Sequence, residues 1–202
     1  TGSGKTHFAM RLLSPQRVKR LVVFDTKENL VDDMELVPDT TRNWRKFIRG
    51  ENIRIQVKPP YAGTANFVDY YERVFARVLY GANCMVYIDE LYNVTQGGQQ
   101  LPANFTAVYT RGRQPKYGRR GQIVAGNIGV VAAVQRPMHM PQFCMTEAEH
   151  FFVFQLQSPD DRKRIADFSH PQLQNPIPDE HGFYYYETRS TEPIYVPEYE
   201  DE

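Results

Sequence analysis

The feature that most constrains this chain is the motif G-S-G-K-T at residues 2–6, which runs directly into the apolar segment 7–13. The motif is the second half of the phosphate-binding loop G-x-x-x-x-G-K-[ST], whose glycines let backbone N–H groups turn inward around a phosphate. A helix that begins at this point adds four free N–H donors and the positive end of its dipole. The candidate nucleotide-binding residues are therefore Gly2, Ser3, Gly4, Lys5 and Thr6.

Within this loop, Lys5 is expected to reach the β- and γ-phosphates of ATP, and the Thr6 hydroxyl is expected to ligate Mg²⁺. The complete motif has its first glycine five positions before Gly4, and a strand leads into it. We therefore expect the sequence as given to lack a short N-terminal segment that holds this strand and the first glycine.

A second motif consists of the apolar run Cys84–Ile88 followed by Asp89 and Glu90. An apolar strand that ends in two carboxylates is typical of a Walker B segment. Its buried end can fix Asp89 as a Mg²⁺ ligand opposite Thr6, and Glu90 can polarise the water that attacks the γ-phosphate. The two motifs together predict a P-loop ATPase that uses ATP and Mg²⁺.

Composition excludes little about partners, because 24 basic and 24 acidic residues balance. Any basic surface must therefore be local.

Cys84 and Cys144 stand far apart in apolar surroundings, which favours buried thiols over a disulfide or a metal site. No apolar run approaches the roughly 18 residues of a membrane span. The 202 residues predict a single domain over 1–202, in which 169–202 form a C-terminal extension.

Short apolar runs alternate with segments whose apolar residues recur at helical spacing. The runs predict strands buried in a mostly parallel sheet, and the segments predict helices on both of its faces. This pattern indicates an α/β fold with a mostly parallel central sheet. Together with the two motifs, it resembles the RecA-like P-loop NTPase sandwich. The aromatic tail 183–196 predicts a C-terminal β-hairpin. The expected strands are 20–25, 52–57, 84–88, 128–134 and 151–156, and the expected helices are 5–13, 41–50, 64–80, 101–110 and 159–168.

Asp25 follows the first of these strands, at the carboxyl edge where α/β proteins place their ligands. It is a second candidate for the site. A residue that only starts a turn is the alternative interpretation.

A third motif, I-G-V-V-A-A-V-Q-R-P at residues 128–137, comes after the other two. In this order, and with the aromatic strand near 151–154, the three motifs resemble the FtsK/HerA branch of P-loop DNA-pumping ATPases. The resemblance runs from Thr1 to about Phe168. A chain this short, without a separate DNA-binding or membrane domain, is similar within that branch to the genome-packaging ATPases of tailless icosahedral viruses with an internal membrane.

The resemblance implies a ring of five or six identical subunits, with ATP bound between neighbours, that pushes double-stranded DNA into a preformed capsid. It implies a capsid or vertex protein as a partner. It also implies a location in the cytoplasm of the infected host cell or at a packaging vertex of the virion. Gln135 matches the polar sensor of the family, which contacts the phosphate or the water. An arginine shortly before the sensor strand is the usual trans-acting finger. Arg111 and Arg113 occupy that region, but the insertion 114–127 separates them from the strand and leaves open which one acts.

The insertion is the candidate DNA contact, since a glycine-flanked loop with Lys116, Arg119 and Arg120 can follow a phosphate backbone without reading bases. A solvated basic loop is the alternative. The helix expected at 41–50 carries a rival basic patch, which we interpret as a solvated face. The residues of that patch are Arg42, Arg45, Lys46 and Arg49.

Two other functions fit parts of the pattern. A secretion or conjugation motor, or a filamentous-phage morphogenesis protein, would keep the ATPase and change the cargo, but such a protein should carry a membrane segment. A P-loop kinase or nucleotide switch would need a lid and an acceptor pocket. A catalytically inactive subunit is disfavoured because Lys5, Asp89 and Glu90 are all present.

Overall fold

The computed structural model describes residues 4–26, 34–60, 67–96, 101–119, 121, 123–178 and 181–197. The chain divides into two compact units, named here the sheet unit (Ala9–Val134) and the terminal unit (Thr1–Phe8 with Gln135–Glu202). The prediction of one domain over 1–202 stays a prediction. No helix among the described residues combines the length and the apolar character needed to cross a membrane.

The sheet unit is built on five parallel strands in the order β2-β3-β1-β4-β7. The central strands consist of apolar residues with no polar alternation, as expected for strands covered on both faces. The predicted parallel sheet is confirmed. The strands are β1 (Leu21–Phe24), β2 (Val37–Pro38), β3 (Arg54–Val57), β4 (Cys84–Ile88) and β7 (Ile128–Ala132).

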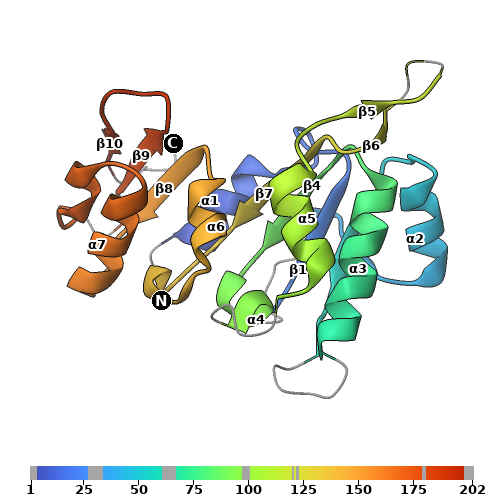
Figure 1. The fold of residues 1–202 in the computed structure, drawn as a ribbon, viewed down its shortest axis with the longest axis horizontal. Coiled ribbons are helices and arrows are strands. Elements are labelled where there is room, and N and C mark those ends of the chain that lie inside the picture. Colours follow the sequence, from blue (N-terminus) through green and yellow to red (C-terminus); the bar gives the residue numbers. More distant parts are fainter. Residues whose placement is uncertain are drawn as a thin grey trace. The chain divides into compact units, whose positions relative to one another are not determined.

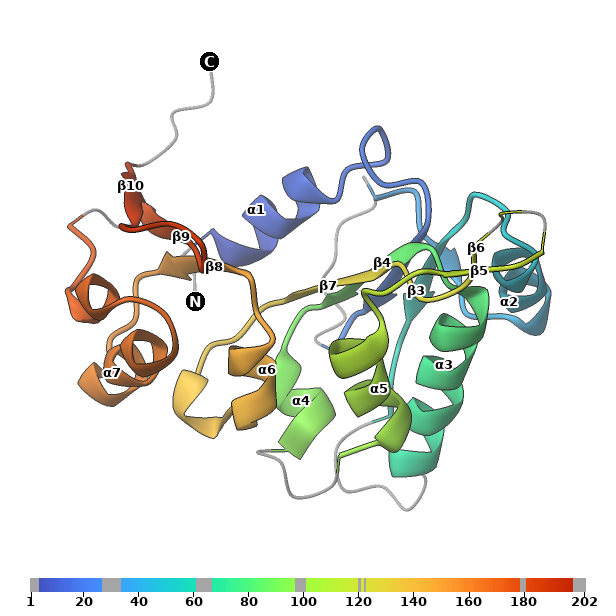
Figure 2. The ribbon, with the colours of Figure 1, turned by 45° about the horizontal axis from the view of Figure 1, so that its top comes forward.

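Helices cover both faces of this sheet, as Figures 1 and 2 show. On one face, Ala9 of α1 (Lys5–Leu12) packs in a buried cluster with Val23 and Tyr87. On the other face, the ring of Phe24 stacks 4.7 Å from Phe75 of α3 (Phe67–Gly81). The remaining helices of the unit are α2 (Thr41–Ile48), α4 (Leu91–Thr95) and α5 (Ala103–Arg111).

A buried arginine joins two of these helices to the sheet. The Arg20 guanidinium donates hydrogen bonds to the carbonyls of Phe47 and Glu51 at the end of α2, and to three carbonyls at the end of α3. Burial lowers the pKa of Arg20 from its ordinary value. The carbonyls at helix ends lack intrahelical partners. The one side chain of Arg20 therefore supplies hydrogen-bond donors to the carbonyls at the ends of two helices. The α3 carbonyls belong to Gly81, Ala82 and Asn83.

The expectation that residues 114–127 form a loop is wrong. They contain an antiparallel hairpin of β5 (Lys116–Tyr117) and β6 (Ile123–Ala125), which pairs with no other strand in the described part of the chain. Gly126 returns the chain from it with φ of +75°, and a Cβ atom there would collide with the Gln114 carbonyl. Strands of two and three residues leave too little sequence pattern to detect.

The terminal unit holds an antiparallel sheet of three strands in the order β10-β9-β8. These are β8 (His150–Phe154), β9 (Phe183–Glu187) and β10 (Ile194–Val196), so the predicted C-terminal hairpin is confirmed as β9–β10. A buried cluster that includes Phe151, Ile165 and Tyr186 packs its helices against the sheet. The helices are η3 (Pro137–His139), α6 (Gln142–Thr146), α7 (Pro159–Phe168) and η4 (Pro171–Gln174).

Candidate functional site

The G-S-G-K-T motif opens a helix, as its pattern predicts. Gly4 has φ of +75°, a conformation that favours glycine, and its carbonyl accepts a hydrogen bond from the N–H of Phe8 at 2.9 Å. Lys5 and Thr6 are the first two residues of α1 and are half-buried. The backbone N–H groups of a helix's first turn are donors of the kind that bind a phosphate. Gly2 and Ser3 lie outside the described residues.

The Walker B carboxylates, Asp89 and Glu90, follow β4 directly and are almost completely buried, with exposed fractions of 1% and 7%. The Tyr87 hydroxyl donates a hydrogen bond to Oδ1 of Asp89 at 3.0 Å. This contact fixes the orientation of the Asp89 carboxylate. Tyr87 is a site residue that the sequence analysis missed, because a tyrosine in an apolar strand gives no signal apart from core packing.

The residue that follows β7, Ala133, forms backbone hydrogen bonds to the residues just before and just after the Walker B carboxylates. The Ala133 N–H donates to the Ile88 carbonyl at 2.8 Å, and the Leu91 N–H donates to the Ala133 carbonyl at 2.9 Å. The segment that leads toward the predicted sensor therefore leaves the sheet beside Asp89 and Glu90. The sensor itself, Gln135, is half-buried and is the first residue of the second segment of the terminal unit.

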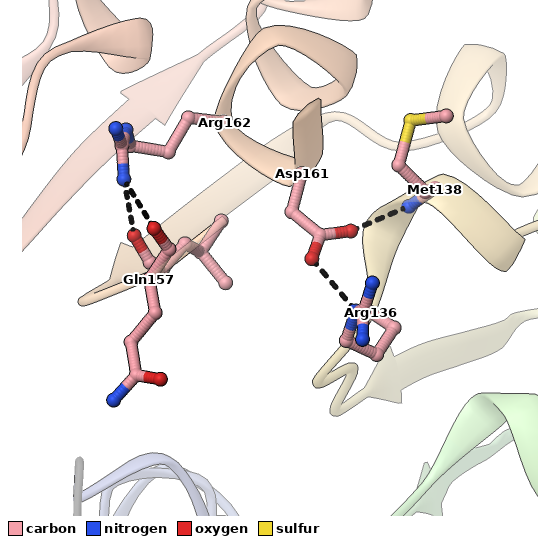
Figure 3. Close-up of polar contacts among 6 residues, drawn as sticks. Arg136, Met138, Gln157, Asp161 and Arg162 are labelled. Atoms are coloured by element: carbon pink, nitrogen blue, oxygen red, sulfur yellow. Dashed lines mark hydrogen bonds and ion pairs between the residues drawn. The ribbon is translucent and has the colours of Figure 1, made fainter. Parts of the chain in front are cut away.

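A buried carboxylate on α7 holds the chain that follows Gln135 (Figure 3). Asp161 is 2% exposed and accepts hydrogen bonds from Arg136 Nε at 2.8 Å and from the Met138 N–H at 2.9 Å. Its neighbour Arg162 donates to the carbonyls that follow β8, including that of Gln157 at 3.0 Å. Helix α7 thus fixes both the turn after Gln135 and the segment after β8. The sequence analysis singled out neither contact.

The predicted arginine fingers lie away from the Walker B carboxylates of their own chain. The Ile128 N–H donates to the Gly112 carbonyl at 2.8 Å, so the end of α5 lies at the amino-terminal end of β7. Strand β7 is parallel to β4 and has five residues, which span about 16 Å. Arg111 and Arg113, both exposed, are therefore at the opposite edge of the sheet from the Walker B carboxylates.

Two of the predicted DNA-binding residues lie on the hairpin and are exposed. Lys116 belongs to β5, and Arg119 is in the connection between the two strands. Tyr117 beside them is 64% exposed. The third, Arg120, lies outside the described residues. The hairpin also leaves from the amino-terminal edge of the sheet, since the Asn83 N–H before β4 donates to the Gly126 carbonyl at 2.9 Å.

Viral packaging proteins are similar to this chain in sequence and in fold. No family model matches the chain. The DNA packaging ATPase P9 of Enterobacteria phage PRD1 is 27% identical over 175 residues, which are 83% of this chain and 66% of the phage protein. The chain thus spans just under two thirds of that relative. The genome packaging NTPase B204 of Sulfolobus turreted icosahedral virus 2, solved with ATP-gammaS, matches with a TM-score of 0.69 and 14% identity over 98% of this chain and 94% of that chain.

The chain has the fold of the genome packaging NTPase B204.

A second structure of this fold, B204 of Sulfolobus turreted icosahedral virus, matches with a TM-score of 0.65 and 12% identity over 97% of this chain and 91% of that one. The resemblance stated from the three motifs is confirmed by the similarity to P9 in sequence and to both B204 proteins in fold. The α/β architecture predicted for a packaging NTPase is confirmed as well.

Each candidate ligand by itself is of a type that suits Mg²⁺, although the described residues contain no group of three or more His, Cys, Asp or Glu side chains that could hold a metal. Mg²⁺ in nucleotide sites uses one or two carboxylates and completes its shell with phosphates and water, so no larger group is required. A buried, oriented Asp89 and the hydroxyl of Thr6 are ligands of this kind.

Proposed function

We propose that this chain is the ATPase of a viral genome-packaging motor, which couples ATP hydrolysis to movement of double-stranded DNA into a preformed capsid. The observation that carries the proposal is its similarity to the DNA packaging ATPase of phage PRD1 over 83% of the chain. The motor would work in the infected host cell, in the cytoplasm or at a packaging vertex, and a capsid or vertex protein would be its partner.

The residue roles follow from the chemistry of the groups at the start of α1 and at the end of β4. Lys5 would bind the β- and γ-phosphates, and Thr6 and Asp89 would be ligands of the cation. When bound, Mg²⁺ neutralises charge on the phosphate oxygens. The Glu90 carboxylate orients the attacking water and accepts its proton. Gln135 donates a hydrogen bond to the γ-phosphate or accepts one from the water.

The positions of Arg111 and Arg113 favour a site shared between subunits. An arginine about 16 Å along β7 from the Walker B carboxylates of its own chain is poorly placed to reach its own γ-phosphate. In a ring of five or six subunits, the same arginine can face the site of a neighbour. There it would neutralise charge as the γ-phosphate leaves.

The hairpin supports the DNA contact. Lys116 and Arg119 are exposed on a short projection whose strands pair only with each other in the described part of the chain. With Arg120, they would contact phosphates, which gives binding without sequence preference. The proposed DNA contact would then lie at the opposite edge of the sheet from Asp89 and Glu90.

The test is steady-state ATP hydrolysis by the purified protein, with and without double-stranded DNA, over a range of protein concentrations. We expect DNA to stimulate turnover and the specific activity to rise steeply with concentration, because the sites form between subunits. A turnover that depends neither on DNA nor on protein concentration would point to a self-contained P-loop kinase or switch. Membrane-dependent assembly would favour a secretion motor.

A further inference from the structure

Three neighbouring strands present polar side chains at the carboxyl edge of the sheet, beside Asp89. Strand β1 lies between β3 and β4, and its last residue, Phe24, pairs with Val57 of β3 and Ile88 of β4. The backbone ladder continues one step further, since the Asp25 N–H donates to the Val57 carbonyl at 3.0 Å and the Asp89 N–H donates to the Phe24 carbonyl at 3.2 Å. Asp25 and Asp89 are therefore adjacent positions on adjacent strands.

The two carboxylates also lie on the same face of the sheet. Gln56 pairs in register with Val23, and its side-chain amide donates to Oδ2 of Asp25 at 2.8 Å. Val23 packs in the same buried cluster as Tyr87, whose hydroxyl bonds to Asp89. Because neighbours in register on parallel strands share a face, Asp25 and Asp89 both lie on the face that the carboxyl-terminal half of α1 covers.

Asp25 is only 1% exposed, and its two carboxylate oxygens differ in their hydrogen bonds within the described part of the chain. Among the described residues, nothing donates a hydrogen bond to Oδ1, although Gln56 satisfies Oδ2. The hydroxyl of Thr26, the next residue, is also buried without a hydrogen-bond partner there. A buried carboxylate without a full set of donors is costly, and a second one on the adjacent strand adds repulsion. The arrangement is explained if a cation and its water complete it.

We propose that Asp25 is a second carboxylate of the Mg²⁺–nucleotide site, which accepts a hydrogen bond through Oδ1 from a water bound to the cation that Asp89 holds. This inference rests on the proposed ATPase function and adds a residue to it. Gln56 then acts as a positioning residue, because its amide leaves one oxygen of Asp25 directed to the site. Residues that contact the ligands of a metal, and not the metal itself, typically contribute 10–100-fold to metal affinity.

The test is a Mg²⁺ titration of the protein with a fluorescent, non-hydrolysable ATP analogue, for wild type and Asp25→Asn. We expect the half-saturating Mg²⁺ concentration to rise about 10–100-fold in Asp25→Asn. Without Mg²⁺, the variant should bind the analogue at least as well as wild type and melt at the same or a higher temperature, since it loses a buried charge. Gln56→Ala should show a smaller rise in the Mg²⁺ requirement.

The matched control is Asp39→Asn, because Asp39 follows β2 at the same edge of the sheet and is held by the Tyr70 hydroxyl at 3.0 Å. Its Mg²⁺ requirement should equal that of wild type. Equal requirements for Asp25→Asn and wild type would overturn the inference and leave the ATPase proposal standing. A lower melting temperature for Asp25→Asn without Mg²⁺ would overturn it too, because the carboxylate would then be structural. Failure of the wild type to bind the analogue would overturn the proposed function itself.

Discussion

The Arg136 side chain, 60% exposed, forms an ion pair at 2.8 Å with Asp161, which is 2% exposed. The same carboxylate binds the Met138 N–H. A double-mutant cycle on Arg136→Ala and Asp161→Ala should give a coupling energy of about 1–2 kcal/mol, reduced from the range for charged hydrogen bonds because the arginine is exposed.

The control for this pair is Lys163–Asp167, an i,i+4 ion pair on α7 with both side chains exposed. Its cycle should give only about 0.3–0.5 kcal/mol. Urea denaturation measures both cycles. Equal coupling energies for the two pairs would contradict a structural role for Asp161 in holding the turn after Gln135.

Glu90→Gln should slow ATP hydrolysis by about 10²–10⁴-fold, because the amide cannot accept the proton of the attacking water. Nucleotide affinity, measured with a fluorescent ATP analogue, should stay close to wild type since Glu90 makes no proposed contact with the phosphates. The exposed Glu51 provides the control as Glu51→Gln, which should retain full turnover. Undiminished hydrolysis by Glu90→Gln would remove Glu90 as the base.

Arg111→Ala or Arg113→Ala should lower kcat by about 10³–10⁵-fold for whichever arginine is the finger. If the finger acts on a neighbour, mixing that variant with wild-type protein before assembly should depress turnover far more than in proportion to the mutant fraction. Steady-state rates at a series of mixing ratios measure this. A straight-line dependence on the mutant fraction would contradict a shared site.

Replacing Lys116, Arg119 and Arg120 together by alanine should weaken DNA binding. It should also make binding less dependent on salt. The slope of log binding constant against log salt concentration should become shallower by about one for each phosphate that is no longer neutralised. ATP hydrolysis without DNA should be unchanged. The matched control removes three exposed arginines from α2 and its C-terminal end, as Arg42→Ala with Arg45→Ala and Arg49→Ala. If the α2 variant loses DNA binding and the hairpin variant retains it, the DNA contact lies on α2.

Stability should fall as the pH rises above about 9. Burial raises the pKa of the Cys84 and Cys144 thiols to about 12, whereas an unfolded thiol ionises near 8.5. Between these values the folded state holds more protons than the unfolded state, so each thiol makes the unfolding free energy fall by about 1.4 kcal/mol for each unit by which the pH rises. The stabilisation that comes from each protonated thiol is fully present below pH 8.5.

Urea midpoints measured between pH 8 and 10 test this dependence, and Cys144→Ala should roughly halve the slope. Burial also raises the pKa of Tyr70 and Tyr71, but unfolded tyrosines ionise near 10, so these residues contribute only at higher pH. A flat profile from pH 9 to 10 would contradict the assignment of both thiols as buried and protonated.

The sheet was predictable where one local signal decides the structure. The continuously apolar residues Cys84–Ile88 favour a short strand covered on both faces, and the carboxylates that follow it are placed by chain connectivity. The same holds for α7, whose predicted bounds 159–168 match the structure, because Pro159 and two aspartates mark its first turn.

The contacts of the site were not predictable, because they join residues distant in sequence. Nothing near Asp25 indicates that Gln56 will hold it, and nothing near Gln135 indicates Asp161. Strand β8 was expected, but its antiparallel pairing with β9 depends on tertiary structure. The helix α4 has only five residues, too few to show a periodic pattern.

The base of the hairpin is bonded to the residues that open β4. The Cys84 N–H donates to the Asn127 carbonyl at 3.2 Å, and the Asn127 side chain donates to the Asn83 side chain at 2.6 Å. The far end of β4, five residues on, carries Asp89. A pulling force on the hairpin would therefore be transmitted along β4, which is hydrogen-bonded on both sides to β1 and β7, and would reach Asp89 at the other end of the strand.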